Sequence, residues 1–173
     1  MKKVEELVVL VNKWAEEKGI HEKGNLFSQV MKTYEEIGEL IVALHNKNRE
    51  ELIDSIGDIQ VCLINACWFI DKGLFIEAFE KKEELLKSFS SILDKKLALK
   101  MPFYVPLKDA SSNIIDLLSE EDKKVSIVSI LFTLEVICTN EDLDMVECLE
   151  SAYNVIAKRT GHMDSNGQFI KDK

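Results

Sequence analysis

The chain has 173 residues, of which 46% are hydrophobic and 31% charged, and its formal net charge is −9 at pH 7. This length suits one domain around one core, and the balance of hydrophobic and charged residues excludes a wholly disordered chain. The negative charge disfavours a surface for the phosphate backbone of a nucleic acid. A small anionic ligand remains compatible with that charge if a divalent cation bridges it to the protein.

Apolar residues recur at helical spacing along most of the chain. Only 7 Gly and 2 Pro interrupt it, which favours long helices over strands and tight turns. The expected helices are residues 4–18, 26–47, 50–71, 75–99, 107–118, 121–138 and 141–159. Residues 21–25 form a polar link, and residues 101–106 form a connection because both prolines, Pro102 and Pro106, break helices. Ser119 with Asp122 resembles a capping start for the sixth helix, and Asn166-Gly167 indicates a turn in the tail.

These patterns predict a single all-α domain, a helical bundle of six or seven helices over residues 1–173. The third helix is apolar nearly all round in its second half, residues 61–70, so it should be central in the fold.

Targeting signals and disulfide patterns are not evident. The N-terminal apolar run is broken by Asn12 and followed by charges, unlike a signal peptide, and no stretch reaches the roughly 18 apolar residues of a membrane span. None of the four cysteines forms a CxxC pair, which indicates free thiols in a reducing compartment. We therefore expect a cytoplasmic protein with no membrane partner and no zinc site.

Two acidic stripes occupy the second and third expected helices. Glu35, Glu36 and Glu39 lie on one side of the second helix, because residues three and four apart are neighbours on a helix surface. Glu51, Asp54 and Asp58 follow at spacings of three and four on the third helix, with Asn65 seven residues further on the same side. The short link between the two helices predicts antiparallel packing, which would let the acidic sides face each other.

The chemistry of such a cluster depends on its burial. Partly buried carboxylates repel, at a cost of several kcal/mol unless cations neutralise them. Oxygen ligands without Cys or His select Mg²⁺, with Mn²⁺ as the alternative, and magnesium commonly completes its shell with substrate phosphates. The pattern thus favours a metal-dependent site for a nucleotide polyphosphate, and the alternative is a pair of solvated helix faces. No GxxxxGK[ST] loop, HExxH or GxSxG motif is present.

Here the sequence resembles the MazG-like nucleotide pyrophosphohydrolases, a family of the all-α NTP pyrophosphatase superfamily, and in particular its phage-type subgroup. The family pattern is EExxE on one helix and ExxD on the next. Glu35-Glu36-Ile37-Gly38-Glu39 matches the first part, and Asp54-Ser55-Ile56-Gly57-Asp58 is similar to the second. The ending, residues 152–163 and 167–171, also resembles that subgroup, as do Asn25, Gln29 and Lys32. The likeness covers residues 1–73 and 142–173, and residues 74–140 would be extra helices beside a four-helix core.

The resemblance implies Mg²⁺-dependent hydrolysis of a (deoxy)nucleoside triphosphate to the monophosphate and pyrophosphate. Glu36, Glu39 and Asp58 would hold the metal with Asp54 as a helper, and Glu35 would orient or deprotonate the attacking water. The roles of Glu35 and Glu36 are interchangeable at this level. The resemblance also implies a homo-oligomer, a dimer or a tetramer.

Candidate substrate contacts have structural alternatives. Lys32, Lys158 and Arg159 would clamp phosphates; ordinary surface charge explains Lys32 and Lys158 equally well and Arg159 somewhat less well. Asn65 would contact phosphate or sugar, or be a satisfied core amide. Trp14 and Gln29 would contact the base, and plain core packing is the alternative for Trp14.

One residue departs from the family pattern. The second-helix glutamate should fall three residues before Asp58, and Ser55 stands there. The missing ligand oxygen would come from Asp54, from the earlier Glu51-x-x-Asp54 pattern, or from water. The departure leaves a second hypothesis open, a non-catalytic helical protein of the same fold that binds nucleotides or a partner.

Overall fold

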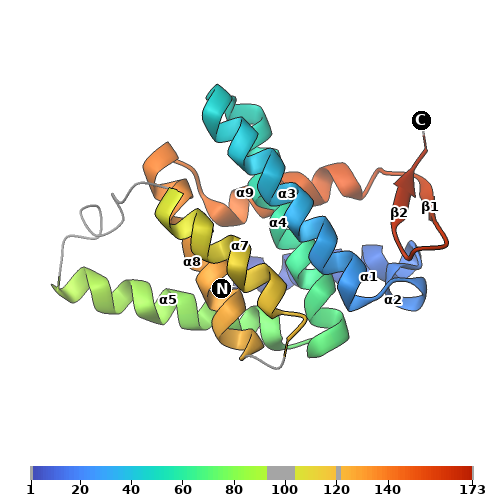
Figure 1. Cartoon of the computed structure of the whole chain (residues 1–173), viewed down its shortest axis with the longest axis horizontal. Coiled ribbons are helices and arrows are strands. Elements are labelled where there is room, and N and C mark those ends of the chain that lie inside the picture. Colours follow the sequence, from blue (N-terminus) through green and yellow to red (C-terminus); the bar gives the residue numbers. More distant parts are fainter. Residues whose placement is uncertain (1, 93–103, 120–121, 173) are drawn as a thin grey trace.

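The computed structural model describes residues 2–92, 104–119 and 122–172 (Figure 1). Its described residues form eight helices and one two-stranded hairpin. The elements are α1 Lys2–Glu17, α2 Ile20–Lys23, α3 Leu26–Asn46, α4 Arg49–Ile70, α5 Leu74–Ile92, α7 Tyr104–Asp116, α8 Lys123–Glu141, α9 Met145–Ile156, β1 Gly161–Met163 and β2 Phe169–Lys171. The prediction of an all-α bundle is confirmed.

The α3–α4 hairpin is set by local signals at its ends. The Asn25 side chain accepts the Ser28 backbone N–H at 2.8 Å, and the Ser28 hydroxyl accepts the Asn25 N–H in return, which fixes the start of α3. Lys47 ends α3 in the left-handed conformation, with φ of 53°. Asn48 then caps α4. With so short a link, the two helices fold back on each other, as expected.

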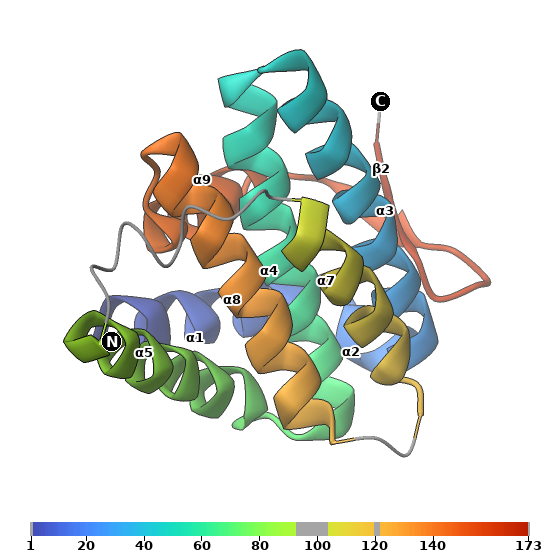
Figure 2. The ribbon, with the colours of Figure 1, turned by 60° about the vertical axis from the view of Figure 1, so that its left-hand side comes forward.

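Helix α4 is the central helix, as predicted, and packs against α1, α2, α3, α5 and α9 (Figure 2). It is buried almost continuously from Ser55 to Cys67. At Gly57 the backbone of α9 comes so close that an added Cβ would lie 2.4 Å from the Cys148 carbonyl oxygen and 2.6 Å from the Ala152 Cβ. Glycine is therefore required where α9 crosses α4.

The sequence patterns predict no membrane-spanning segment, but the length and composition of α4 are compatible with one. In the described part of the chain it is the one helix long and apolar enough to cross a membrane, but 72% of its most apolar window is buried inside the fold. Such burial is typical of the core helix of a soluble protein. All four cysteines are free and buried.

Several helix ends differ from the expected ones. Helix α7 begins at Tyr104 and contains Pro106, because proline is tolerated in a first turn whose N–H groups have no helical partner. Asp122, and not Ser119, caps α8 by accepting the N–H groups of Lys124 and Val125.

The last helix also starts later than residue 141. Residues up to Glu141 belong to α8, Asp142 ends that helix in the left-handed conformation, and Asp144 caps α9. The short helix α2, which begins at Ile20, occupies the first three residues of the expected link 21–25. Residues 93–99 of the fourth expected helix, residues 101–103 of the connection and Glu121 lie outside the described residues.

The C-terminal hairpin pairs β1 with β2, so that Gly161 lies opposite Lys171 and Met163 opposite Phe169. The predicted turn at Asn166-Gly167 is present, with Gly167 at φ of 77°. The ring of Phe169 meets that of Trp14 edge-on at 5.9 Å between centroids. The hairpin is thereby seated beside α1 and α2, as Figure 1 shows.

Candidate active site between α3, α4 and the C-terminal hairpin

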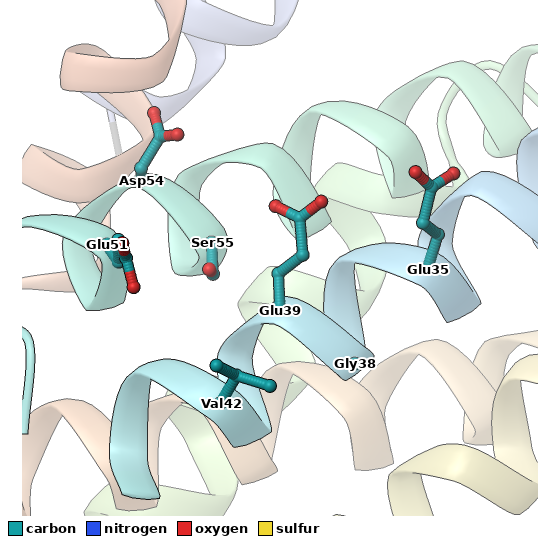
Figure 3. A pocket seen from close by; sticks show the side chains of 7 residues that line it. All are labelled: Glu35, Gly38, Glu39, Val42, Glu51, Asp54 and Ser55. Carbon is teal, nitrogen blue, oxygen red and sulfur yellow. The ribbon is translucent and has the colours of Figure 1, made fainter. Parts of the chain in front are cut away.

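The two acidic stripes line a pocket of about 450 Å³ between α3 and α4, here called the outer pocket. Figure 3 shows Glu35 and Glu39 projecting from the same side of α3, with Ser55 of α4 across from Glu39. The residues that line the outer pocket are Glu35, Gly38, Glu39, Val42, Glu51, Asp54 and Ser55.

A second cavity, the inner pocket, adjoins the first and shares Glu35 with it. It has a volume of about 250 Å³. Side chains from α1, α3, α4, the segment after α9 and the hairpin meet in it. The polar and aromatic residues in its wall are Trp14, Ser28, Gln29, Lys32, Glu35, Glu36, Asp58, Asn65, Arg159, Gln168, Phe169 and Lys171.

Most of the predicted site residues therefore fall in one of two adjoining cavities. Trp14, Gln29, Lys32, Glu35, Glu36, Asp58, Asn65 and Arg159 line the inner pocket, and Glu35, Glu39 and Asp54 line the outer one. Lys158 lines neither and is exposed. The position of Lys158 thus does not support the expected phosphate contact.

Lys32 joins the two paired glutamates. Its Nζ lies 2.8 Å from Glu36 Oε1 and 3.2 Å from Glu35 Oε1, while the Glu36 side chain is only 5% exposed. Burial raises the pKa of Glu36, and the hydrogen bond and charge of Lys32 oppose that rise. For Lys32, burial alone would lower the pKa, but its contacts with Glu36 and Glu35 outweigh burial and the net shift is upward. The lysine thus offsets part of the cost of burying the Glu36 carboxylate.

Asp58 is less well compensated. Its Oδ2 lies 3.6 Å from Arg159 Nη2, and its Oδ1 is buried without a hydrogen-bond partner. Burial raises the pKa of Asp58, and the charges of Arg159, Lys171 and Lys32 oppose the rise. An acceptor oxygen without a partner in a cavity wall is a point where a cation or a donor would gain a full interaction.

Two further polar atoms of the inner pocket wall lack partners. The Trp14 Nε1 donor and the Asn65 Oδ1 acceptor are buried and make no hydrogen bond. A buried group of this kind costs about 1–3 kcal/mol, so a ligand that supplies both partners is favoured. Plain core packing, the alternative considered for Trp14, leaves its indole N–H unexplained.

The fit to a divalent cation is partial. Within residues 2–92, 104–119 and 122–172, no three His, Cys, Asp or Glu side chains lie close enough to form a metal-binding group. Glu36 and Asp58 face the inner pocket, whereas Glu39 and Asp54 face the outer one. The donors are nonetheless all oxygens, and Asp58 Oδ1 has no partner, which suits a hard cation that keeps several waters.

Ser55 stands where the resemblance to the MazG-like proteins predicts a glutamate. It is 3% exposed and lines the outer pocket with Glu39 and Asp54. Asp54, one residue earlier, is exposed in the same cavity. This arrangement leaves room in the outer pocket for a longer acidic side chain or for water.

Residue patterns missed the contribution of the hairpin. Gln168, Phe169 and Lys171 line the inner pocket, although they are more than 100 residues away in sequence from Asp58, the last carboxylate of the two acidic stripes. Their only signal was the resemblance of the chain ending to the phage-type subgroup. Comparison with models of protein families, with curated proteins and with solved structures finds no match to this chain.

Proposed function

We propose that this protein is a Mg²⁺-dependent nucleoside triphosphate pyrophosphohydrolase of the MazG-like family, which hydrolyses its substrate to the monophosphate and pyrophosphate. The observation that carries the proposal is the convergence on the inner pocket of carboxylates and cations from four segments, which are α3, α4, the residues after α9 and β2; two of the carboxylates, Glu36 and Asp58, are buried. Such groups are costly to bury, and their concentration in one cavity favours a charged ligand.

The charge of the inner pocket supports a metal-bound substrate in particular. Three cations, Lys32, Arg159 and Lys171, balance three carboxylates, Glu35, Glu36 and Asp58. A free triphosphate would meet as much repulsion as attraction in such a wall. A triphosphate that arrives with a divalent cation brings charges of both signs, and each finds a partner.

In this proposal Glu36 and Asp58 hold Mg²⁺ from the inner pocket, and Glu39 and Asp54 hold it from the outer one. The metal supplies charge stabilisation at the phosphate oxygens and lowers the pKa of bound water. Glu35 borders both pockets, and its side chain is 61% exposed, so it can exchange a proton with water. Glu36 is buried and held by Lys32, which suits a metal ligand better than a base. The proposal therefore gives metal binding to Glu36 and the proton exchange to Glu35.

The aromatic end of the inner pocket would bind the nucleoside. Trp14 Nε1 offers a donor and Asn65 Oδ1 an acceptor, both without a partner in the protein. Gln29 is 8% exposed in the same wall. Every nucleobase presents donors and acceptors at its edge, so these groups support nucleotide binding without selecting a base.

The proposal includes a cytoplasmic location, consistent with four free buried thiols, and a homo-oligomer. Apolar side chains follow an exposed stripe of α3, with Phe27, Tyr34, Ile41 and Val42 each at least 46% exposed. Gly38 lies within this stripe, and an added Cβ there would meet nothing within 4 Å. An exposed helical stripe of this kind suits packing against a second copy of the chain.

A second candidate function is a non-catalytic protein that binds nucleotides or a partner through the same pocket. Two observations favour it: Ser55 in place of the family glutamate, and carboxylates divided between two cavities. Both reduce the number of oxygens available to one metal ion.

The experiment that separates the two is a panel of ribo- and deoxynucleoside triphosphates with Mg²⁺ and, separately, Mn²⁺. The proposal expects equimolar monophosphate and pyrophosphate from at least one substrate. Glu39→Gln should abolish this product while leaving the helical circular dichroism intact, and Glu6→Gln on the exposed face of α1 is the matched control. A native protein that binds triphosphates but releases no pyrophosphate with either metal would favour the second candidate.

A further inference from the structure

The C-terminal hairpin contributes a cation to the inner pocket that has so far been given no individual role. β2 ends at Lys171, which lines the inner pocket, and its positive charge lowers the pKa of Asp58 against the effect of burial. Lys171 lies opposite Gly161 in the hairpin, and Arg159 is two residues before Gly161. The antiparallel register therefore brings Lys171 and Arg159 to the same end of the hairpin, next to α4.

The three cations of the inner pocket are not equally engaged. Lys32 is held by Glu35 and Glu36, and Arg159 pairs with Asp58 at 3.6 Å. In the part of the chain that the structure describes, no carboxylate lies within 4.0 Å of the Lys171 ammonium. Lys171 is therefore the cation whose charge is available to a ligand.

The backbone of the hairpin is seated closely enough to place this side chain. An added Cβ at Gly167 would lie 2.9 Å from the Lys23 carbonyl oxygen and 3.2 Å from the Gly24 Cα, so the turn packs directly on the end of α2. At the other end, the Asp172 N–H donates to the Thr160 carbonyl at 3.0 Å and closes the strand pair just beyond Lys171. Phe169 rests on Trp14 between these two points.

We propose that Lys171 is a substrate-binding residue whose ammonium contacts the phosphate oxygens of the nucleotide, and that the hairpin exists in this fold to carry it into the inner pocket. The inference rests on the proposed function, because it presumes a nucleotide in the inner pocket. A lysine acts on phosphate as a point charge with rotatable donors, so arginine should largely replace it.

The test compares Lys171→Gln with Lys171→Arg and with Lys158→Gln, a nearby lysine that lines neither pocket. The probes are a triphosphate with a nonhydrolysable α,β-bridge and the corresponding nucleoside, measured by calorimetry with Mg²⁺ at constant ionic strength. The base is the one that gives the highest pyrophosphate release in the panel. Each variant is first checked for native circular dichroism.

We expect Lys171→Gln to weaken triphosphate binding by about tenfold to a hundredfold and to leave nucleoside binding unchanged. Lys171→Arg should stay within about threefold of the native protein, and Lys158→Gln should match it. Equal affinity of Lys171→Gln and the native protein for the triphosphate would overturn the inference, as would an equal loss for the nucleoside, which indicates a packing role. A native protein that neither binds nor hydrolyses any triphosphate would refute the proposed function itself.

Discussion

Asp58→Asn should stabilise the metal-free protein while removing its activity. The substitution keeps the shape of the side chain and removes a charge that the fold compensates poorly. In the native protein Asp58 is 9% exposed, its Oδ1 has no hydrogen-bond partner, and Arg159 approaches the other oxygen only to 3.6 Å. A carboxylate in these surroundings lowers the free energy of unfolding, which is common for residues of a functional site.

The size of the gain follows from two opposing contributions. Asparagine keeps an unpaired carbonyl oxygen at this position, so the substitution removes only the extra cost of burying a negative charge, about 1–3 kcal/mol for a partly compensated carboxylate. The ion pair with Arg159 offsets at most about 1 kcal/mol of this cost, because the distance between Asp58 Oδ2 and Arg159 Nη2 is long and the Arg159 side chain is 20% exposed. The free energy of unfolding should therefore rise by about 1 kcal/mol in Asp58→Asn, which corresponds to a Tm higher by about 2–4 °C for a chain of this length.

The gain should depend on pH in a defined direction. Burial raises the pKa of Asp58 above its ordinary value of 3.8, so the native protein has the penalty only where the folded carboxyl is ionised. The stability difference between variant and native protein should be full at neutral pH. It should shrink as the pH falls through the raised pKa and disappear below pH 3.8, where both folded and unfolded carboxyls are protonated.

The assay is thermal unfolding without divalent ions and again with Mg²⁺, together with pyrophosphate release. The native protein should gain stability from Mg²⁺ and the variant should not, and turnover should fall by at least about a hundredfold. Asp109→Asn, on the exposed face of α7, is the control. A variant that melts below the native protein, or that responds to Mg²⁺ and substrate as the native protein does, would refute the reasoning.

Three further predictions test the surroundings of the site. Ser55→Glu adds to the outer pocket the carboxylate that the resemblance predicts, so the Mg²⁺ concentration for half-maximal pyrophosphate release should fall several-fold; an unchanged or higher concentration would contradict the proposed metal position. Gly57→Ala should lower the free energy of unfolding by about 1–3 kcal/mol in urea titrations, because its Cβ would meet the Cys148 carbonyl oxygen, and native-like stability would show that α9 can move aside. Burial lowers the pKa of His21 below 6.5, so its contribution to stability is full above pH 6.5 and is lost as the pH falls below it. His21→Gln should therefore flatten the decline of Tm between about pH 6.5 and 5, and an unchanged slope would exclude this histidine as the cause.

The helices and most of their ends could be predicted from residue patterns, because these depend on neighbours in sequence. The apolar spacing gave α1, α3 and α4 to within two residues, and Asn25, Asn48 and Gly19 lie where helices start or stop. The incorrect predictions of helix ends concern positions where two local sequence signals compete. Pro106 was expected to exclude a helix and is instead accommodated in the first turn of α7, and Asp122 replaced Ser119 as the cap of α8.

The carboxylates of α3 and α4 could also be anticipated, since two helices joined by so short a link must lie antiparallel. The sequence did not indicate which of these carboxylates would be buried. Glu36 and Asp58 are enclosed because α1, α9 and the hairpin cover that part of the α3–α4 face, whereas Glu39 and Asp54 remain open. Periodicity assigns a side of a helix but not what packs on it.

The sequence by itself thus determined a helical chain with an acidic seam between two adjacent helices, because both properties arise from residues three to four positions apart. Only the tertiary structure decided the division of that seam into two cavities and the presence of Lys171 and Phe169 in one of them. These contacts join positions more than 100 residues apart, and they form only after the hairpin settles on α1 and α2. No local pattern encodes such a contact, since its free energy comes from surfaces that meet only in the folded chain.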